Sequence, residues 1–420
     1  SDTSSTSTGV NGMAFDDASD PFQQVVYLQE GDAPPLRFVT CSRDYESNSY
    51  TSITVTIQNI SDGSIYKQYT FTDQAGGKLR STSYPSLTRI QIEGDLISDG
   101  NGIIYLVLSN SLYARSLYDG GKYSRYTLYA YRIIKIDTND DSITVLEGPD
   151  QPRRGLKTPN PSSGCLVGEY LIITDTVTVS KIDTSSMTEV LKRNVPVQSN
   201  NAISSKNEQS RIFGDSTSCY LAEGITLGSP DISTYNEDRQ NIRLYEINPS
   251  DLTMTLKSEY EEYRDSFRMH WTFAVPRGHI VKNSVAYAIY SIQKGGMVLL
   301  SSTGMAKKID PYTRSMSMCA AQNGIYIYSK SRYGGASIIK LNESNGSYES
   351  ETTVDFETNY PSLNAANDKL YLMSTNYDYK PFVEYDETTL NRVSLPPPAD
   401  TLDTRMYPGC FSMFNRLRYA

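Results

Sequence analysis

One short phrase recurs along the chain, and it constrains the fold more than any other feature. A strand-like run leads into each copy, an Asp or Asn opens a polar turn, and a second run follows. An Asp or Asn side chain at the start of a turn can accept a hydrogen bond from the backbone two residues on, which favours a tight reversal. Each copy therefore predicts a β-hairpin. The six clear copies are KIDTNDDSITVL at 135–146 and its variants at 181–191, 246–256, 308–318, 340–350 and 384–395.

A second element precedes each hairpin, namely a short apolar strand after a turn signal, such as GIIYLVLS at 102–109 or GIYIYSKS at 324–331. Each unit then reads strand, turn, strand, loop, strand, turn, strand. A seventh unit near the start contains 36–42 and 51–71. Units of four strands that repeat four to eight times are typical of a β-propeller. The residues that mark equivalent turns are Asn59, Asp137, Asp183, Asn248, Asp310, Asn342 and Asp386.

We therefore predict an all-β fold, a β-propeller of seven four-stranded blades, with eight or six blades as alternatives. The segment 408–420 resembles the first half of a unit, 361–372, and then the chain stops. Such a half-unit could complete the first blade, so that pairing of N- and C-terminal strands closes the ring and removes exposed edges. We expect one domain over residues 22–420. Residues 1–21 begin with a Ser/Thr-rich run that predicts a flexible tether.

Composition narrows the possible functions. The net charge of −9 argues against nucleic-acid binding, which draws most of its affinity from cations against phosphate. No stretch approaches the 18 or more apolar residues of a membrane-spanning helix. Five widely spaced cysteines form no zinc-ligand pattern and are expected to be buried thiols, with one long-range disulfide as the alternative. Motifs of nucleophilic hydrolases, nucleotide-binding enzymes and zinc peptidases do not occur, so no catalytic residue and no cofactor is assigned.

The candidate ligand site lies in long insertions. In a propeller, the tight hairpins emerge on one face, and the loops that join second to third strands and neighbouring blades emerge on the other. Insertions rich in Tyr and Arg occur as loops on that second face, for example at 42–50, 109–129, 149–164 and 224–241. Tyr offers a rigid face with a hydroxyl group, and Arg a planar set of donors, which suits polar, ring-bearing or anionic ligands. An equally simple interpretation is that a Tyr-rich protein has Tyr in its loops anyway. The candidate residues are Tyr113, Arg115, Tyr118, Lys122, Tyr123, Arg125, Arg153, Arg154 and Lys157.

Two features that could indicate a metal or a catalytic base are weak. DTNDDS at 137–142 matches three ligand positions of a calcium loop but lacks the Gly and the Glu that follow in such loops. An Asx-type hairpin turn explains it better. His270 and His279 stand nine residues apart without partner motifs, so packing or an exposed loop is the better explanation for both. No metal site is predicted.

The Ser/Thr run at 1–12 in front of seven propeller units resembles the surface lipoproteins of gut Bacteroidota. The resemblance implies a cell-surface or outer-membrane location, with the periplasm as the alternative. It also implies a lipid anchor outside this chain and capture of a siderophore, cobalamin or glycan beside a TonB-dependent transporter. No signal peptide is present, so the chain is either cytoplasmic or a mature form.

Three functions follow as hypotheses. The first is a non-enzymatic, monomeric, extracytoplasmic protein that captures a small molecule or glycan. The second is a carbohydrate-active hydrolase or lyase that uses loop carboxylates. The third is a protein-interaction platform with an exposed apolar patch.

Overall fold

The protein, seen here as a computed structural model, consists of antiparallel β-sheets over its described residues. These residues are 25–27, 37–46, 49–59, 64–74, 77–83, 85, 89–92, 96–99, 102–115, 125–148, 153–155, 163–174, 178–196, 207–227, 239–263, 275–291, 296–309, 313–331, 335–357, 361–366, 368–374 and 383–393. Within them, no helix is long and apolar enough to cross a membrane.

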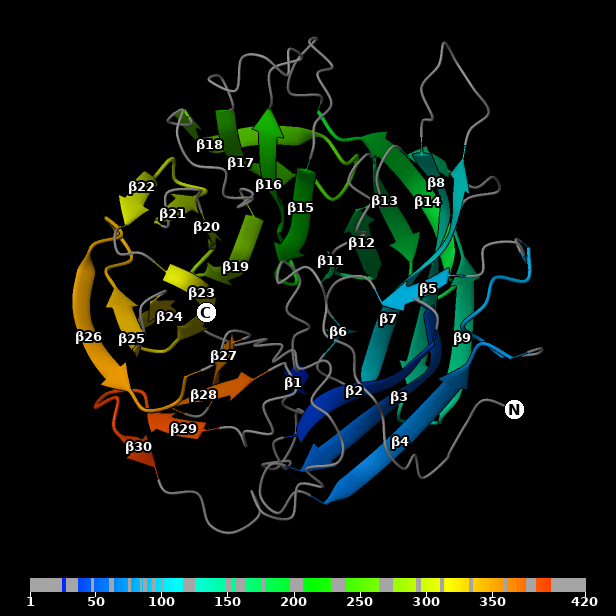
Figure 1. Cartoon of the computed structure of the whole chain (residues 1–420), viewed down its shortest axis with the longest axis horizontal. Helices are drawn as coiled ribbons and strands as arrows, with labels where there is room; N and C mark the ends of the chain where they lie inside the picture. The colour runs from blue at the N-terminus through cyan, green and yellow to red at the C-terminus, as the bar shows by residue number, and fades with distance from the viewer. Residues whose placement is uncertain are drawn as a thin grey trace.

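Seven sheets follow one another along the chain (Figure 1). The first contains β1 (Val25–Tyr27), β2 (Arg37–Glu46), β3 (Ser49–Asn59) and β4 (Ile65–Thr72). The second contains β5 (Arg89–Ile92), β6 (Ile97–Ser98), β7 (Ile103–Arg115), β8 (Arg125–Asp137), β9 (Ser142–Glu147) and β10 (Arg153–Gly155). The third contains β11 (Ser163–Val167), β12 (Tyr170–Thr174), β13 (Thr178–Asp183) and β14 (Thr188–Asn194).

The remaining four sheets have the same up-and-down order. They are β15 (Asn207–Gly214), β16 (Cys219–Leu227), β17 (Arg239–Ile247) and β18 (Met254–Tyr263); β19 (Val275–Lys282), β20 (Val285–Ser291), β21 (Met297–Ser301) and β22 (Ala306–Ile309); β23 (Thr313–Ala321), β24 (Gly324–Ser331), β25 (Ala336–Leu341) and β26 (Tyr348–Val354); and β27 (Pro361–Ala366), β28 (Lys369–Ser374), β29 (Val383–Asp386) and β30 (Arg392–Val393).

The sheets are arranged as blades around a common axis. Figure 1 shows the first strand of each sheet near the centre and the last at the circumference. The first strands of consecutive sheets contact one another, as in β11 with β15, β19 with β23 and β23 with β27. Consecutive strands pair with their sequence neighbours, which is the blade topology of a propeller. The predicted seven-bladed β-propeller is confirmed.

The second blade departs from the simple pattern because its inner and outer positions are each divided in two. β5 and β6 both pair with β7, while β9 and β10 both pair with β8. The outer position changes strand at Gly148, whose amide donates to the Tyr131 carbonyl at 2.7 Å. A Cβ at Gly148 would lie 2.6 Å from that carbonyl oxygen, so only glycine permits this approach. Six strands thus fill four positions.

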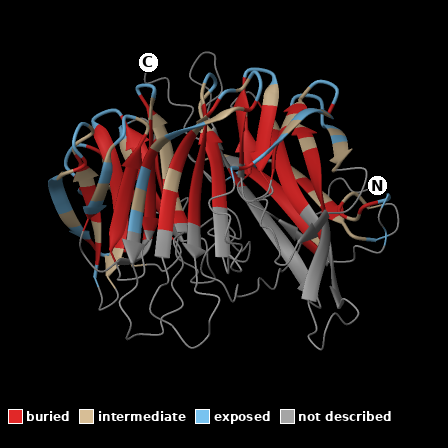
Figure 2. Cartoon of the chain, turned by 90° about the horizontal axis from the view of Figure 1, so that it is seen from above, coloured by how far each residue is buried: buried red, intermediate tan, exposed pale blue. Residues whose placement is uncertain are grey.

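The core lies between the blades. Both faces of each inner strand pair are covered by neighbouring blades, which explains runs of buried residues such as MVLLS in β21. One cluster, for example, joins Tyr131 and Ile133 of the second blade to Ile173 and Ile182 of the third. Figure 2 shows this buried interior beneath exposed turns.

The predicted ring closure and tether are not covered by the described residues. The segment 408–420 and residues 1–21 lie outside them. The four strands of the first sheet come from residues 25–72, and those of the last from 361–393. The domain boundary at residue 22 stays a prediction.

Candidate functional site

The two faces of the propeller are distinct, as the unit pattern predicts. The turns between first and second strands, and between third and fourth strands, lie on one face, which we call the hairpin face; in Figure 2 they form the upper rim. The connections from second to third strands, and those between blades, lie on the opposite face, which we call the loop face. Five of the six clear copies of the repeated phrase occupy the hairpin face.

The repeated phrase forms Asx turns. Oδ1 of Asp137 accepts a hydrogen bond from the Asn139 amide at 2.9 Å, and Oδ1 of Asp183 accepts one from the Ser185 amide at 2.9 Å. The same bond, from the amide two residues on, recurs at Asn248, Asn342 and Asp386. At Asp183, bonds from the amide and hydroxyl of Ser186 lower the pKa of the carboxyl group to about 2. The predicted turn chemistry is confirmed at these positions.

The residue four places after the turn-opening Asp or Asn adopts a left-handed backbone. It is Asp141, Met187, Leu252, Gly346 and Leu390 in five blades, with φ between 51° and 66°. Met187, Leu252 and Leu390 are buried in the clusters shared with the preceding blade. A left-handed leucine is strained, so packing must offset this cost. The turn therefore also fills the space between blades.

The sequence prediction for Asp310 is wrong. We expected a third-to-fourth hairpin there, but β22 ends at Ile309 and β23 begins at Thr313, so 310–312 connects two blades. The hairpin of this blade is instead at 301–305, where the Ser301 amide donates to the Met305 carbonyl at 2.9 Å and Gly304 has φ 95°. The resemblance of KID at 308–310 to the other copies reflects strand composition alone, because the turn position is fixed by the strand pairing.

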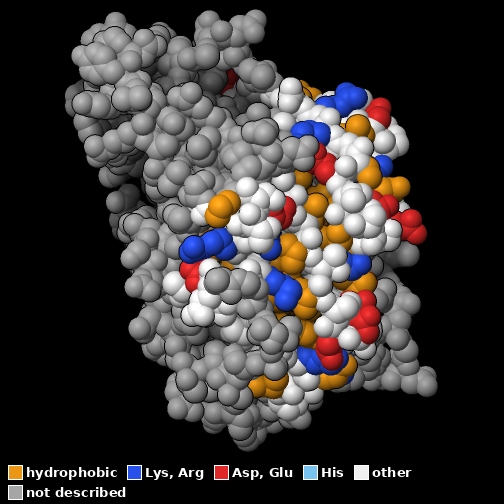
Figure 3. All heavy atoms as spheres, turned by 90° about the vertical axis from the view of Figure 1, so that its right-hand side faces the viewer, with side chains coloured by type: hydrophobic (Ala, Val, Ile, Leu, Met, Phe, Trp, Pro, Cys, Tyr) orange, Lys and Arg blue, Asp and Glu red, His pale blue; other side chains and the backbone are white. Residues whose placement is uncertain are grey.

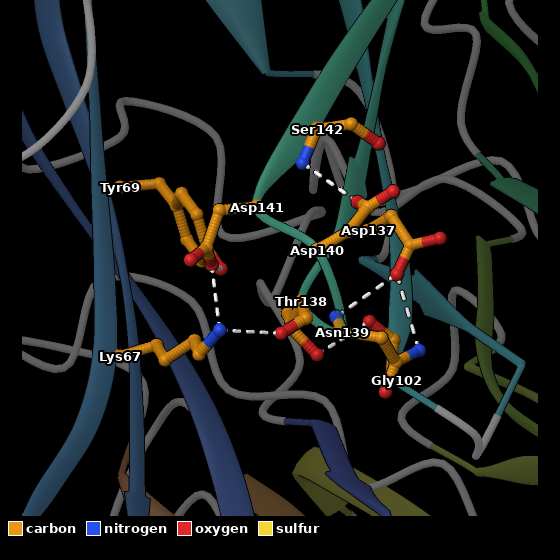
Figure 4. Close-up of polar contacts among 9 residues, drawn as sticks. All are labelled: Lys67, Tyr69, Gly102, Asp137, Thr138, Asn139, Asp140, Asp141 and Ser142. Atoms are coloured by element: carbon orange, nitrogen blue, oxygen red, sulfur yellow. Dashed lines mark hydrogen bonds and ion pairs between the residues drawn. The ribbon is translucent and has the colours of Figure 1, made fainter.

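Side chains of one blade bind the turn of the next. Lys67 Nζ donates to Asp141 Oδ1 at 2.7 Å and to the Thr138 carbonyl at 2.6 Å, and Tyr69 donates to Asp141 at 2.5 Å (Figure 4). The carbonyl after the turn-opening residue is an acceptor in three other blades. Lys135 donates to the Thr184 carbonyl, Tyr287 to the Glu343 carbonyl and Tyr326 to the Glu387 carbonyl.

These contacts explain the turn carboxylates without a metal. Asp137 accepts from Asn139, Asp140 accepts from the Ser142 amide at 2.9 Å, and Asp141 is held by the first blade. Among the described residues, no group of three or more His, Cys, Asp or Glu could hold a metal ion. The phrase is therefore assigned to the scaffold.

Much of the tyrosine content also belongs to the scaffold. The second strands of several blades carry a buried Tyr, as at Tyr105, Tyr220, Tyr287, Tyr326 and Tyr371. Burial raises the pKa of Tyr326 and Tyr371 well above the usual value. Tyrosine enrichment by itself is therefore no evidence for a binding face.

The arginine candidates are brought together in the second blade. β7 and β8 extend as a ribbon towards the loop face, and Arg115 and Arg125 are direct partners at its last described position. Arg153 and Arg154 lie on β10 and pair with Tyr129 and Leu128 of the same ribbon. Tyr113 pairs with Thr127, next to Gly155 of β10. Five of the nine candidates thus share one sheet. Tyr118, Lys122, Tyr123 and Lys157 lie outside the described residues.

Part of what the sequence indicated as loops on this face is strand. β2 and β3 pair as far as Glu46 and Ser49 within the predicted loop 42–50. β16 and β17 likewise pair out to Leu227 and Arg239, which also pairs with Tyr263 of β18. Cross-strand pairing therefore continues beyond the common blade length in these two blades. The loop face is therefore built on projecting ribbons.

The arginine ribbon is supported at its base by Glu147 of β9. The carboxylate accepts bonds from the Thr82 amide at 2.6 Å, the Thr82 hydroxyl at 2.8 Å and the Ser83 amide at 3.1 Å. It also pairs with Arg132 of β8, whose Nε donates to the Lys78 carbonyl at 2.5 Å. Burial alone would raise the pKa of Glu147, but the bonds from Ser83 and Thr82 outweigh it and lower the pKa to about 2. This cluster fixes 78–83 beside the ribbon.

The described histidine has a packing role, as expected. His279 of β19 stacks on Phe213 of β15 with ring centroids 4.7 Å apart. The residue is half-buried between two inner strands. Loss of solvation, together with the charge of Arg211, lowers the pKa of His279 to about 3. A histidine that stays neutral at physiological pH is unlike a general base tuned near 7. His270 lies outside the described residues.

The fourth blade carries a row of charged residues that was not predicted from the sequence. Glu223, Arg243 and Glu259 are successive partners across β16, β17 and β18. Arg243 Nε lies 3.3 Å from Glu259 Oε2, and Tyr290 of the fifth blade donates to the Arg243 carbonyl at 3.0 Å. The row connects two blades and lies within the scaffold. Strand alternation in LAEGITL and NIRLYEI could have indicated it.

Comparison with known proteins yields only distant structural similarities. No family model matches the chain, and no curated protein matches it. Solved structures that align with it include a chain of the mitotic checkpoint complex, with 9% identity over 87% of both chains and a TM-score of 0.49. A "putative 6-phosphogluconolactonase" from Bacteroides uniformis has 13% identity over 86% of this chain and 94% of the other, with a TM-score of 0.46. AztD from Citrobacter koseri has 11% identity over 85% and 93%, with a TM-score of 0.41. The assignment of the fold therefore rests on the strand pairing.

Proposed function

We propose that this propeller captures, without catalysis, a polar or anionic ring-bearing small molecule or glycan on its loop face. The site is centred on the β7–β8–β10 ribbon, with Arg115, Arg125, Arg153 and Arg154 as its cations. Lys122 and Lys157, with Tyr113, Tyr118 and Tyr123, complete the candidate set. The ligand class includes ferric siderophores, corrinoids and oligosaccharides.

The observation that carries the proposal is the register of the ribbon. Arg115 lies directly opposite Arg125, and two further arginines on β10 pair with the same strand β8. Like charges at directly opposed positions of an antiparallel pair are destabilising. A chain of net charge −9 that nevertheless places four arginines in one sheet, two of them directly opposed, is well suited to an anionic group, which would offset their charge.

The support at the base of the ribbon is consistent with a preorganised site. Glu147 ties 78–83 to the base of β8 through bonds from Thr82, Ser83 and Arg132. A rigid support lowers the entropy that a ligand must offset when it orders its site. Glu147, at the base of the ribbon, is engaged by these bonds and serves as an anchor.

The cellular setting is part of the same proposal. We place the protein outside the cytoplasm, at the outer membrane or cell surface, as a monomer held by a lipid anchor outside this chain. It would deliver its ligand to a TonB-dependent transporter. The periplasm is the alternative location.

A ligand screen with arginine variants tests the site. Thermal shift against ferric catecholate siderophores, corrinoids and oligosaccharides selects the ligand, because a molecule that binds only the native state raises Tm. Isothermal titration then compares Arg115→Ala, Arg125→Ala and Arg154→Ala, each expected to weaken binding about tenfold or more. Arg193→Ala, an exposed arginine on the outer strand β14, is the matched control and should bind like the wild type.

Three results would overturn the proposal. Unchanged affinity in all three ribbon variants would place the ligand elsewhere. Breakdown of an oligosaccharide during the titration would instead support the hydrolase hypothesis, and a protein partner without any small ligand would support the interaction platform.

A further inference from the structure

Two buried cysteines from different blades are in contact. Cys165 lies on the inner strand β11 of the third blade, and Cys219 on the second strand β16 of the fourth. Their sulfur atoms are 3.1 Å apart, and 54 positions separate them along the chain. Both are free thiols in this structure. The remaining described free cysteine, Cys319, belongs to a different cluster, at the boundary of the sixth and seventh blades.

The surroundings of the pair favour a bond between the two sulfurs. They share one apolar cluster with Val167, Ile172, Ile212 and Leu221, which holds both blades in place. Cys165 is paired with Ile172 inside its own sheet, and Cys219 with Gly214 and Ile247 in the next. Each side chain therefore has a fixed backbone, and a disulfide bond of about 2.05 Å needs only a small approach of the sulfurs.

We propose that Cys165 and Cys219 form a disulfide that links the third blade to the fourth. The two thiols lose two electrons and two protons as the S–S bond forms. The oxidant is a disulfide, either of a thiol–disulfide oxidoreductase or of oxidised glutathione, and it is reduced to two thiols. The inference does not depend on the ligand proposed above.

Burial decides when the bond can form. Desolvation, with the neighbouring Cys165 thiol, raises the pKa of Cys219 well above the usual value, so little thiolate exists in the folded protein. Exchange therefore takes place while the blades are still opening and closing, and the finished disulfide is protected. An oxidising compartment, such as the bacterial periplasm, supplies the conditions.

Peptide mapping of the full chain tests the bond directly. The protein is refolded with reduced and oxidised glutathione, alkylated in denaturant without reductant, and digested with trypsin. We expect the peptides 158–181 and 212–239 to appear joined, and to separate after reduction. Full alkylation of Cys165 and Cys219, or linkage of either to another cysteine, would overturn the proposal.

Thermal unfolding gives a second, independent measurement. Oxidised protein should melt about 5 °C above the same protein in reductant, because the cross-link restricts the unfolded chain. The double variant Cys165→Ala with Cys219→Ala should show no such difference, whereas Cys319→Ala, the matched buried control, should keep it. If the double variant does not fold, the peptide map on the wild type still decides. A wild-type Tm that is independent of reductant in mapped, cross-linked protein would contradict the stabilising role.

Discussion

Lys67 of the first blade and Asp141 of the second are joined by an ion pair of 2.7 Å across the blade boundary. The same lysine donates to the Thr138 carbonyl, so it holds both the side chain and the backbone of the neighbouring turn. Comparable contacts from Lys135, Tyr287 and Tyr326 recur around the ring. A propeller has no continuous backbone pairing between blades. Apolar packing is non-directional, so such side-chain contacts help to fix the position of one blade relative to the next.

Removing the lysine should loosen this boundary. We expect Lys67→Met to lower the free energy of unfolding by about 1 kcal/mol, mainly through the unpaired Thr138 carbonyl. Lys192→Met is the control, because Lys192 has similar exposure but pairs with Glu189 on its own strand. Urea unfolding at low salt measures both. A larger effect of Lys192→Met would contradict the role of the cross-blade contact.

The position that opens the turn should tolerate only side chains that can accept a hydrogen bond from the backbone. Asn248 Oδ1 receives the Ser250 amide at 3.0 Å and the Ser250 hydroxyl at 2.8 Å. Asn248→Ala should therefore lower the free energy of unfolding by about 1 kcal/mol. Asn248→Asp introduces the residue found at 137, 183 and 386 and should be nearly neutral. Chemical denaturation compares the two. Equal losses would show that the acceptor is not what stabilises the turn.

The left-handed leucine should contribute through burial. Leu252 is fully buried between the third and fourth blades, although its φ is 61°. We expect Leu252→Ala to destabilise the protein by about 2–4 kcal/mol, since a cavity forms and the strained backbone remains. Leu256→Ala, at a 45% exposed position on β18, should change stability by less than about 0.5 kcal/mol. Similar losses at both positions would refute this account.

Glu147 should make stability depend on acid pH. Its pKa of about 2 in the folded protein lies below the ordinary 4.5, so its contribution is complete above pH 4.5 and is lost as the pH falls towards 2. The full contribution is on the order of 2–3 kcal/mol. Glu147→Gln should be less stable at pH 7 but lose less between pH 4.5 and 2.5. Parallel pH profiles of the two proteins, from denaturant titrations, would disprove the assignment.

The arginine ribbon predicts a trade-off between stability and binding. Arg125→Glu replaces a like-charge pair with Arg115 by an opposite-charge pair, so it should stabilise the free protein by about 0.2–1 kcal/mol. The same change should abolish binding of an anionic ligand. Arg193→Glu, outside the ribbon, should leave binding unchanged. A destabilised Arg125→Glu variant with normal binding would contradict both parts.

The repeated four-strand unit, read from the sequence, determined the fold class, the blade count and the face that carries the tight turns. Asp137, Asp183 and Asp386 act in the turns through bonds to amides two residues away, and such local chemistry can be inferred from neighbours in the chain. Asp310 shows the limit of that inference. Its segment repeats the letters of the phrase, yet strand pairing places the hairpin at 301–305.

Tertiary structure alone decided how distant residues combine. It placed Arg115 opposite Arg125 and brought β10 to the same ribbon, which supports the candidate site without testing it. It set Cys165 against Cys219 and buried many of the tyrosines inside the blades. It also decided which side chains share a surface, and Figure 3 shows that the described flank over the outer strands mixes hydrophobic, basic and acidic side chains. These relationships depend on register and on packing between blades, because contacts across a boundary join residues that no local pattern relates.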